Sequence, residues 1–253
     1  MYTALNTPNI LMLSIIQKNI KKVLLLTLSL CINSAKAQIG EYRNDLCIGI
    51  NVGLTMNEVG FEPLIAQKML TKPTLGLTFR YTSEKFFKAY CAFQAELNYT
   101  QIGWKENIMD SKLMPLPDTY ERTIDYLQIP FMARLAWGKE SKGAMFYILL
   151  GPQIGFAIND HTSKSSTWTT LQDGTPDRPN YVTAQYDLPI KNKFDYGITG
   201  GAGVEISTSI GHFLLEGRYY YGLADIFGNS KRDVFSRSNH TTIVGKVSYL
   251  IDL

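Results

Sequence analysis

The chain has 253 residues, a formal net charge of +3 and 45% hydrophobic residues. Its charge is unevenly distributed, because residues 1–37 contain four of the 25 basic residues and no acidic residue. Residues 38–253 therefore carry 21 basic and 22 acidic residues, a net charge of −1. The basic excess belongs to the N-terminal segment, so it gives no support for nucleic-acid binding. The 216 residues that follow suit a single domain.

The N-terminal segment has the three parts of a secretory signal peptide. Residues 18–22 are rich in lysine, residues 23–32 form an apolar run, and the sequence Ala-Lys-Ala ends at Ala37. The apolar run is far shorter than the roughly 20 residues that a membrane-spanning helix needs. We therefore expect residues 1–37 to be a cleaved signal peptide and residues 38–253 to be the mature domain.

The rest of the chain alternates between apolar and small or polar residues, the period expected of β-strands. In the first such run, Leu46, Ile50 and Leu54 share one face, while Cys47 and Asn51 share the other. No convincing long amphipathic helix interrupts the pattern. The eight alternating runs are residues 46–54, 74–81, 89–104, 123–137, 144–158, 193–207, 212–223 and 241–253.

The connections between these runs alternate in length. Short connections are expected at 83–88, 138–143 and 208–211, and long ones at 56–72, 105–122, 159–192 and 224–240. This arrangement predicts an all-β fold, an eight-stranded antiparallel up-and-down transmembrane β-barrel. It also predicts a location in the cell outer membrane, with long loops extracellular and termini periplasmic. The alternative is a soluble, lipocalin-like ligand binder with its apolar face inward.

Aromatic and proline residues add detail to this prediction. Trp137 and Phe146 lie near short turns, whereas Trp104 and Phe156 lie near long loops, as expected of two interfacial bands. Pro130 and Pro152 each remove a backbone donor and suggest local bulges.

If the apolar face meets lipid, the other face lines a lumen that an eight-stranded barrel fills with side chains. Pairing across the turn at 208–211 sets Arg218 opposite Gly201 and Glu216 opposite Gly203, and pairing across 138–143 sets Arg134 beside Tyr147. Buried charges need partners. We therefore expect a mutually neutralising structural network, with a narrow polar path as the alternative. Its members are Arg80, Glu96, Arg134, Asp195, Glu205, Glu216, Arg218 and Lys246.

Few residues indicate catalysis or metal binding. Asp160, His161 and Ser163, at the start of the longest expected loop, include the residue types of a hydrolase or acyltransferase site. Such residues are also ordinary in loops, so we expect no enzyme. Three scattered histidines give no metal-ligand spacing. Cys47 and Cys91 fall on opposite strand faces and are expected to stay free thiols. No cofactor is expected.

Several segments together resemble the PorT-like outer-membrane β-barrel proteins of Bacteroidetes-type bacteria. The resemblance implies an eight-stranded barrel in contact with outer-membrane lipid and with the barrel insertion machinery. That machinery usually recognises a terminal aromatic residue, whereas this chain ends in Leu253. The family's founding member is linked to type IX protein secretion, which makes secretion-system proteins candidate partners. The matching segments are residues 93–103, 126–131, 146–152, 194–203 and 215–223.

Three functional hypotheses follow. The first is a non-enzymatic barrel with a filled lumen that anchors or presents extracellular loops. The second is an accessory subunit of a secretion or surface-assembly system. The third is an enzyme at the rim of the barrel.

Overall fold

The computed structural model describes residues 40–139 and 142–253. The chain divides into two units, Met1–Glu41 and Tyr42–Leu253, and the second unit contains the folded domain. The predicted signal peptide and its cleavage site lie outside the described residues. Among the residues that the structure describes, no helix is long and apolar enough to cross a membrane.

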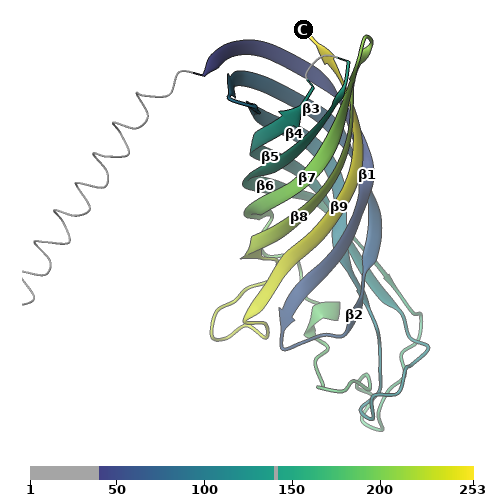
Figure 1. Cartoon of the computed structure of the whole chain (residues 1–253). Helices are drawn as coiled ribbons and strands as arrows, with labels where there is room; N and C mark the ends of the chain where they lie inside the picture. Colours follow the sequence, from purple (N-terminus) through teal and green to yellow (C-terminus); the bar gives the residue numbers. More distant parts are fainter. Residues whose placement is uncertain (1–39, 140–141) are drawn as a thin grey trace, which may run out of the picture. The chain divides into compact units, whose positions relative to one another are not determined.

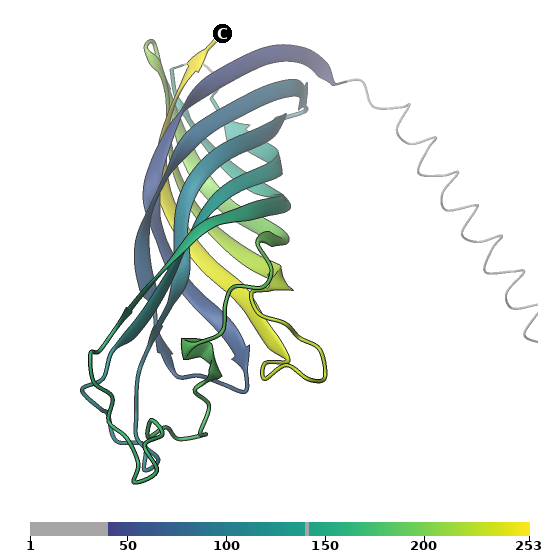
Figure 2. The same cartoon turned by 180° about the vertical axis from the view of Figure 1, so that it is seen from behind.

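The second unit is one antiparallel sheet that closes on itself (Figures 1 and 2). Each long strand pairs with the next long strand in the chain, β4 with β5 included, and β1 pairs with β9 to complete the ring. The eight-stranded prediction is confirmed, and a two-residue strand, β2, adds to the edge of β4. The strands are β1 (Glu41–Glu62), β2 (Gln67–Lys68), β3 (Leu70–Phe86), β4 (Ala89–Glu106), β5 (Tyr120–Gly138), β6 (Ala144–Lys164), β7 (Phe194–Thr208), β8 (Gly211–Asp225) and β9 (Arg237–Asp252).

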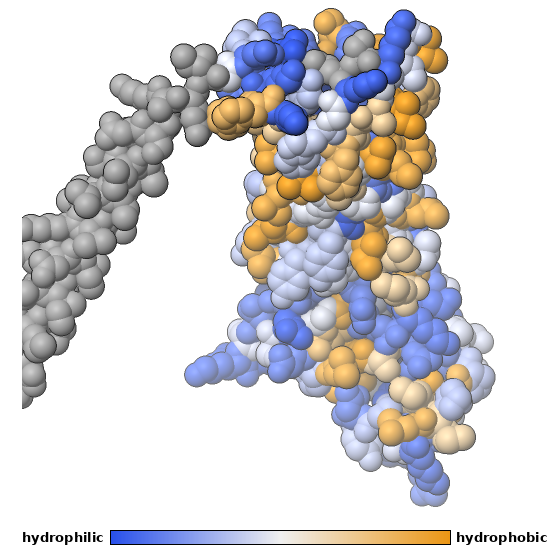
Figure 3. All heavy atoms as spheres, in the orientation of Figure 1, coloured by the Kyte–Doolittle hydropathy of each residue, from blue (hydrophilic) through white to orange (hydrophobic). Residues whose placement is uncertain are grey.

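The predicted alternation fixes which side chains point outward. Ile50, Val52 and Leu54 of β1 are exposed on the outside of the barrel, while Cys47 and Asn51 are buried inside. The outer surface of the barrel wall is accordingly rich in hydrophobic side chains (Figure 3). This polarity is the reverse of a lipocalin, whose apolar face points inward. The soluble alternative is therefore wrong for this fold.

The strands extend beyond the runs that the sequence predicts. β1 has 22 residues and β6 has 21, whereas a tilted strand needs only about 9 to 11 residues to cross a bilayer. Asp160, His161 and Ser163, expected in a loop, lie in β6 and pair with β5. The alternation fades at these strand ends because the outward side chains there no longer need to be apolar, although backbone pairing continues.

The strand registers agree with the sequence prediction for one hairpin and correct it for another. Gly201 lies opposite Arg218 across β7 and β8, as predicted. In the β5–β6 hairpin, Arg134 lies opposite Leu149 rather than Tyr147, a shift of two residues. The side-chain contact survives this shift because diagonal neighbours still meet: the Arg134 guanidinium lies 3.9 Å from the centre of the Tyr147 ring.

The bulges predicted at the two prolines are wrong. The β5–β6 register is the same before and after Pro130, with Ile129 opposite Ile154 and Ala133 opposite Leu150. A proline removes only its own ladder hydrogen bond, which does not require an extra residue. The irregularities occur instead between Thr82 and Glu84 in β3, Asp125 and Tyr126 in β5, and Tyr221 and Asp225 in β8.

The aromatic residues divide between the outer surface and the interior. Trp137, Phe146 and Phe156 are exposed on the outside of the barrel, as predicted. Trp104 is fully buried, so its assignment to an interfacial band is wrong. It shares the even-numbered face of β4 with Glu96, which points inward, and strand alternation therefore places its ring inside.

Candidate functional site

The centre of the lumen holds a compact charge cluster around Glu96 of β4. Arg218 donates two hydrogen bonds to the Glu96 carboxylate, of 2.9 and 2.6 Å, and Lys246 donates another to Glu96 Oε2. Arg218 also donates to Glu216 Oε2 at 2.8 Å. Two carboxylates and two cations thus neutralise one another. Because Gly201 lies opposite Arg218, the long guanidinium side chain has room to turn into the lumen.

A second cluster surrounds Glu205, nearer the end of the barrel where the short turns at 87–88 and 209–210 lie, which we call the short-turn end. Arg80 donates to Glu205 Oε2 at 2.7 Å, and Arg134 donates to the same oxygen. His212 Nδ1 lies 2.7 Å from the other carboxylate oxygen, Oε1. All these side chains are buried or nearly so. Glu205 therefore joins β7, β3, β5 and β8 across the lumen.

Asp195 lies inside the barrel apart from these two clusters. It accepts a hydrogen bond of 2.7 Å from the Tyr220 hydroxyl, and no lysine or arginine pairs with it among the described residues. Tyr126 and His240 form a neighbouring contact of 3.2 Å. The eight predicted lumen residues are thus all buried, but they form two ion-pair clusters and one separate carboxylate rather than a single network.

The opposite end, which we call the long-loop end, is closed by apolar side chains. Phe61 of β1 packs against Trp104 of β4 with ring centres 5.2 Å apart, and against Phe235 at 5.1 Å. Phe227 packs on the same group. The segments 63–69, 107–119, 165–193 and 226–236 extend from this end (Figure 2). We refer to these segments and the strand ends packed with them as the loop layer.

Hydrogen bonds connect the segments of the loop layer to one another. Asp118 accepts bonds of 3.0 and 3.2 Å from Thr169 and lies 3.5 Å from Arg178. Tyr186, in a short 3-10 helix (Ala184–Tyr186), donates to Glu106 Oε2 at 2.7 Å and accepts from Arg178 Nε at 2.8 Å. Burial raises the pKa of the Tyr186 hydroxyl above its usual range. The phenol is therefore a neutral donor that fixes the loops together.

The loop layer contains a cavity of about 320 Å³. Its walls are mainly apolar, and Arg178 and Gln185 contribute polar groups. Within the described chain, Arg178 Nη2 and Gln185 Oε1 have no hydrogen-bond partner. Leu64, Leu113 and Pro179 are among the apolar lining residues. This combination suits an apolar group that carries one polar atom or a few.

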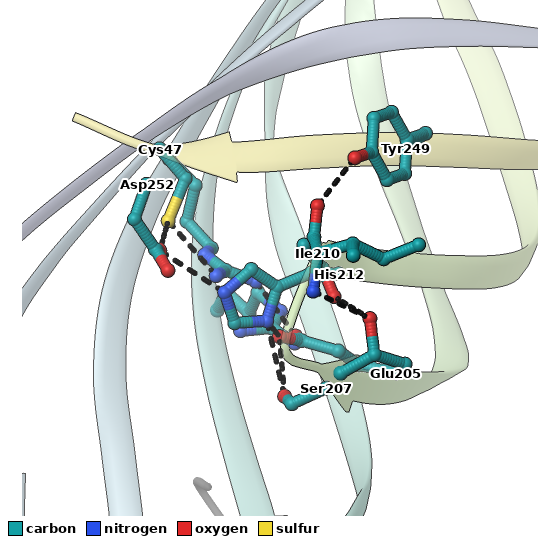
Figure 4. A network of polar contacts seen from close by, with 11 residues as sticks. Cys47, Glu205, Ser207, Ile210, His212, Tyr249 and Asp252 are labelled. Atoms are coloured by element: carbon teal, nitrogen blue, oxygen red, sulfur yellow. Dashed lines mark hydrogen bonds and ion pairs between the residues drawn. The ribbon is translucent and has the colours of Figure 1, made fainter. Parts of the chain in front are cut away.

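The short-turn end holds three possible metal ligands that the sequence spacing does not reveal. Cys47 Sγ donates to Asp252 Oδ1 at 3.1 Å, and His212 Nε2 lies 3.0 Å from the same oxygen (Figure 4). The three ligand atoms lie within 4.8 Å of one another. They come together because β1 and β9 close the barrel, which sets Cys47 directly opposite Asp252. The two cysteines of the described residues, Cys47 and Cys91, are free thiols.

The residues proposed for a rim enzyme do not form a catalytic arrangement. His161 is exposed, and its ring nitrogen contacts Asn159 at 3.2 Å and Asp125 at 3.3 Å. Asp160 is engaged by Arg122, with Nη2 2.7 Å from Oδ2. A nucleophile needs a base that is itself oriented by a third group. At this end of β6, His161 pairs with Asn159 and Asp125, whereas Asp160 pairs with Arg122.

A closed antiparallel ring with an apolar outer wall and a charged lumen defines an outer-membrane-type β-barrel. The chain belongs to the family described as outer membrane protein beta-barrel domain, whose model matches residues 36–228. No curated protein matches the chain in sequence.

Several solved structures are similar to this chain at low identity. Ail, the attachment invasion locus protein of Yersinia pestis, is 12% identical, with a TM-score of 0.34 over 83% of this chain and 99% of that chain. OprG from Pseudomonas aeruginosa is 14% identical, with a TM-score of 0.39 over 84% and 98%. Neisserial surface protein A is 11% identical, with a TM-score of 0.33 over 81% and 96%. The family model, rather than these likenesses, assigns the class.

Proposed function

We propose that this chain is a non-enzymatic outer-membrane barrel whose filled lumen anchors a folded loop layer at the cell surface. The observation that carries the proposal is how little empty space the lumen contains. The cavity in its centre, lined by Thr74, Gln128, Arg218 and their neighbours, measures only about 20 Å³. A single water needs roughly 10 to 15 Å³ of such space, so this cavity holds about one water, which supports a filled lumen.

The charge clusters support the same conclusion. A conducting pore keeps its lining groups hydrated and free to contact ions, whereas Glu96 and Glu205 are each saturated by neighbouring cations. Breaking such buried pairs is costly. The lumen residues therefore act as a rigid plug that connects opposite walls of the barrel. The loop layer lies at the long-loop end of the same strands.

Bilayer conductance tests the filled lumen. The purified barrel, reconstituted in planar bilayers beside a wide-pore porin as the positive control, is expected to show no large steady ion conductance. Steady conductance well above that of protein-free bilayers would contradict the proposal. Recovery in the outer-membrane fraction, with migration on gels that changes on heating, tests the location.

The proposed orientation places the loop layer outside the cell and the short turns and chain termini in the periplasm. An epitope inserted at Gly174, in an exposed loop of the loop layer, should be labelled on intact cells. The same epitope inserted between Ser209 and Ile210 should be labelled only after the outer membrane is permeabilised. The opposite labelling pattern would reverse the orientation. Mass spectrometry of the mature protein should find Gln38 as its first residue.

A second candidate function is that of an accessory subunit in a secretion or surface-assembly system. The supporting observation is the cavity of about 320 Å³, beside which Leu113, Met114 and Tyr181 are exposed. Exposed apolar groups around a pocket are typical of interaction sites. The resemblance of residues 93–103 and 194–203 to PorT-like proteins points the same way. Normal export of surface proteins in cells that lack this chain would remove this candidate.

A hydrolase or acyltransferase at the rim is the third candidate, and it rests only on residue types in β6. Replacing His161 with glutamine should leave any lipid or peptide hydrolysis by the purified barrel unchanged. Loss of a measurable activity in this variant would favour the enzyme.

A further inference from the structure

We propose that Cys47, His212 and Asp252 bind a zinc ion at the short-turn end of the barrel, with a fourth coordination position open to the adjacent cavity. Figure 4 shows the three side chains pointing toward one another from adjacent strands. β1 supplies the thiol, β8 the imidazole and β9 the carboxylate. This site is independent of the proposed function, because it neither requires nor blocks the loop layer at the other end.

The positions of the ligand atoms fit a tetrahedral ion. Asp252 Oδ1 lies 3.1 Å from Cys47 Sγ and 3.0 Å from His212 Nε2. Tetrahedral zinc, with bonds of about 2.0 to 2.3 Å, separates its ligand atoms by roughly 3.3 to 3.7 Å. Asp252 Oδ1 therefore needs to move away from each of the other two atoms by only a few tenths of an ångström, and Cys47 Sγ and His212 Nε2 lie within 4.8 Å of one another. Asp252, with a side chain 69% exposed at the end of β9, has the freedom to make this adjustment.

Glu205 orients the histidine for metal binding. His212 Nδ1 lies 2.7 Å from Glu205 Oε1 and 3.0 Å from the Ser207 hydroxyl. The Glu205 carboxylate holds the proton on Nδ1. In the metal-free site Nε2 faces Asp252 and donates to it, so zinc takes the place of the Nε2 proton. Carboxylate–histidine–zinc arrangements of this kind are the common outer support of zinc sites. Arg80 and Arg134 in turn fix Glu205.

The charges around the site are compatible with a divalent ion. Arg80 Nη2 donates a hydrogen bond of 3.0 Å to Cys47 Sγ, whereas burial and the Asp252 carboxylate favour the protonated thiol, so zinc must displace the thiol proton. Arg80 and Arg134 oppose a cation, but both pair with Glu205. Zinc binding replaces the thiol proton of Cys47 and the Nε2 proton that His212 donates to Asp252, and both protons pass to solvent. The negative charges near the ion are then the Cys47 thiolate and the carboxylates of Asp252 and Glu205. The positive charges are zinc and the two guanidinium groups. Asp45 and Lys142, which also line the cavity, add one charge of each sign.

The mixture of ligands selects the metal. Calcium and magnesium require oxygen ligands, whereas a thiolate, an imidazole and a carboxylate together are typical of zinc. The three ligands line a cavity of about 500 Å³ at the short-turn end. This cavity gives the ion a route of entry and supplies a water molecule as the fourth ligand. The site is thus of the open kind, with three protein ligands.

Cobalt titration tests the site, because Co²⁺ occupies tetrahedral zinc sites and reports on a bound thiolate by absorption in the near ultraviolet. The full barrel, purified without a polyhistidine tag and folded in detergent, should bind one Co²⁺ with a thiolate-to-metal band. One equivalent of Zn²⁺ should abolish the band. Cys47→Ser should remove it, whereas Cys91→Ser and His161→Gln, which alter the other thiol and an exposed histidine, should retain it.

Two further variants test the other ligands. His212→Gln and Asp252→Asn should each weaken Zn²⁺ binding by more than about tenfold, because even the loss of a partner that only supports a ligand costs about 10- to 100-fold. Heat-modifiable migration of each variant verifies that the barrel has folded. If Cys47→Ser does not fold, alkylation of Cys47 protected by Zn²⁺ provides the same information on the intact chain. The proposal is overturned if wild-type protein shows no band, if the band survives Cys47→Ser, or if both other variants bind Zn²⁺ as tightly as the wild type.

Discussion

The lumen and the core of the loop layer are both built on the inward faces of the same strands, yet they consist of opposite kinds of side chain. β4 contributes Glu96 to the lumen and Trp104 to the loop layer, both on its inward face. β5 likewise contributes Arg134 to one and Tyr120 to the other. The difference follows from what surrounds each part. Where lipid covers the outside, apolar residues belong there and polar ones remain for the interior.

Beyond the lipid, the outside of the strands meets water, and apolar side chains gain free energy by moving inward. The loop layer therefore has the core of a soluble protein, made of Phe61, Phe227 and their neighbours. The comparison implies that the lumen is sensitive to loss of a charge, whereas the loop layer is sensitive to loss of volume.

The largest expected effect comes from breaking the charge cluster around Glu96. Glu96→Gln removes the carboxylate that pairs with Arg218 and Lys246, so two buried cations lose their main partner. We expect the free energy of unfolding to fall by about 3 to 5 kcal/mol, the cost of breaking a buried ion pair. Urea unfolding in phosphocholine vesicles measures it. Glu58→Gln, at an exposed position of β1, is the control and should change little. Equal losses in the two variants would contradict the prediction.

A smaller effect is expected from creating a cavity in the loop layer. Ile226 is 2% exposed and packs in the apolar core, so Ile226→Ala should cost about 2 to 4 kcal/mol of local stability. Limited proteolysis should cut the segment 226–236 faster, while the barrel keeps its heat-modifiable migration. Ile210→Ala removes the same atoms from an exposed turn at the short-turn end and should have no effect. Unfolding of the whole barrel by Ile226→Ala would mean that the two regions are not separate.

The smallest effect concerns the hydroxyl of Tyr186. Tyr186→Phe leaves Glu106 and Arg178 without this partner and should cost about 1 to 2 kcal/mol, which faster proteolysis of segment 165–193 would report. Because burial raises the pKa of Tyr186 in the folded protein, its contribution is complete below the usual tyrosine pKa of about 10 and is lost as pH rises further. Proteolysis of the wild type should therefore accelerate above about pH 10, and the variant should lack this component. Tyr181→Phe, at an exposed position, should behave as the wild type. A variant that keeps the alkaline acceleration would contradict the assignment.

The sequence predicts the membrane-facing part of the fold well, because lipid imposes strict alternation there. The inward positions of Glu96, Glu205 and Arg218 follow from this alternation alone. The β7–β8 register was also predictable, since a two-residue turn leaves little freedom. The β5–β6 register was off by two residues because alternation does not distinguish shifts by an even number.

The sites at the two ends were less predictable. The inward packing of Trp104 required knowing where the lipid ends, which hydrophobic alternation does not specify. Cys47 and Asp252 are 205 residues apart and meet only through closure of the ring. The one signal that could have found the cluster is the expectation that the first and last strands pair. Applied to the alternating faces, it places Cys47 and Asp252 at the same end of the lumen.

Because β1 and β9 pair with each other, the barrel would keep the same strand pairs wherever in the ring the chain began and ended. Every long strand has two hydrogen-bonded neighbours, and the pair formed by β1 and β9 runs without a break from Cys47 opposite Asp252 to Glu62 opposite Arg237. A circular permutant that links the ends of β9 and β1 and opens at the turn between Ser209 and Ile210 would preserve every ladder. Removal of β9, in contrast, would leave β1 and β8 with unpaired backbone N–H and C=O groups in the lipid bilayer, which offers no hydrogen-bond partners.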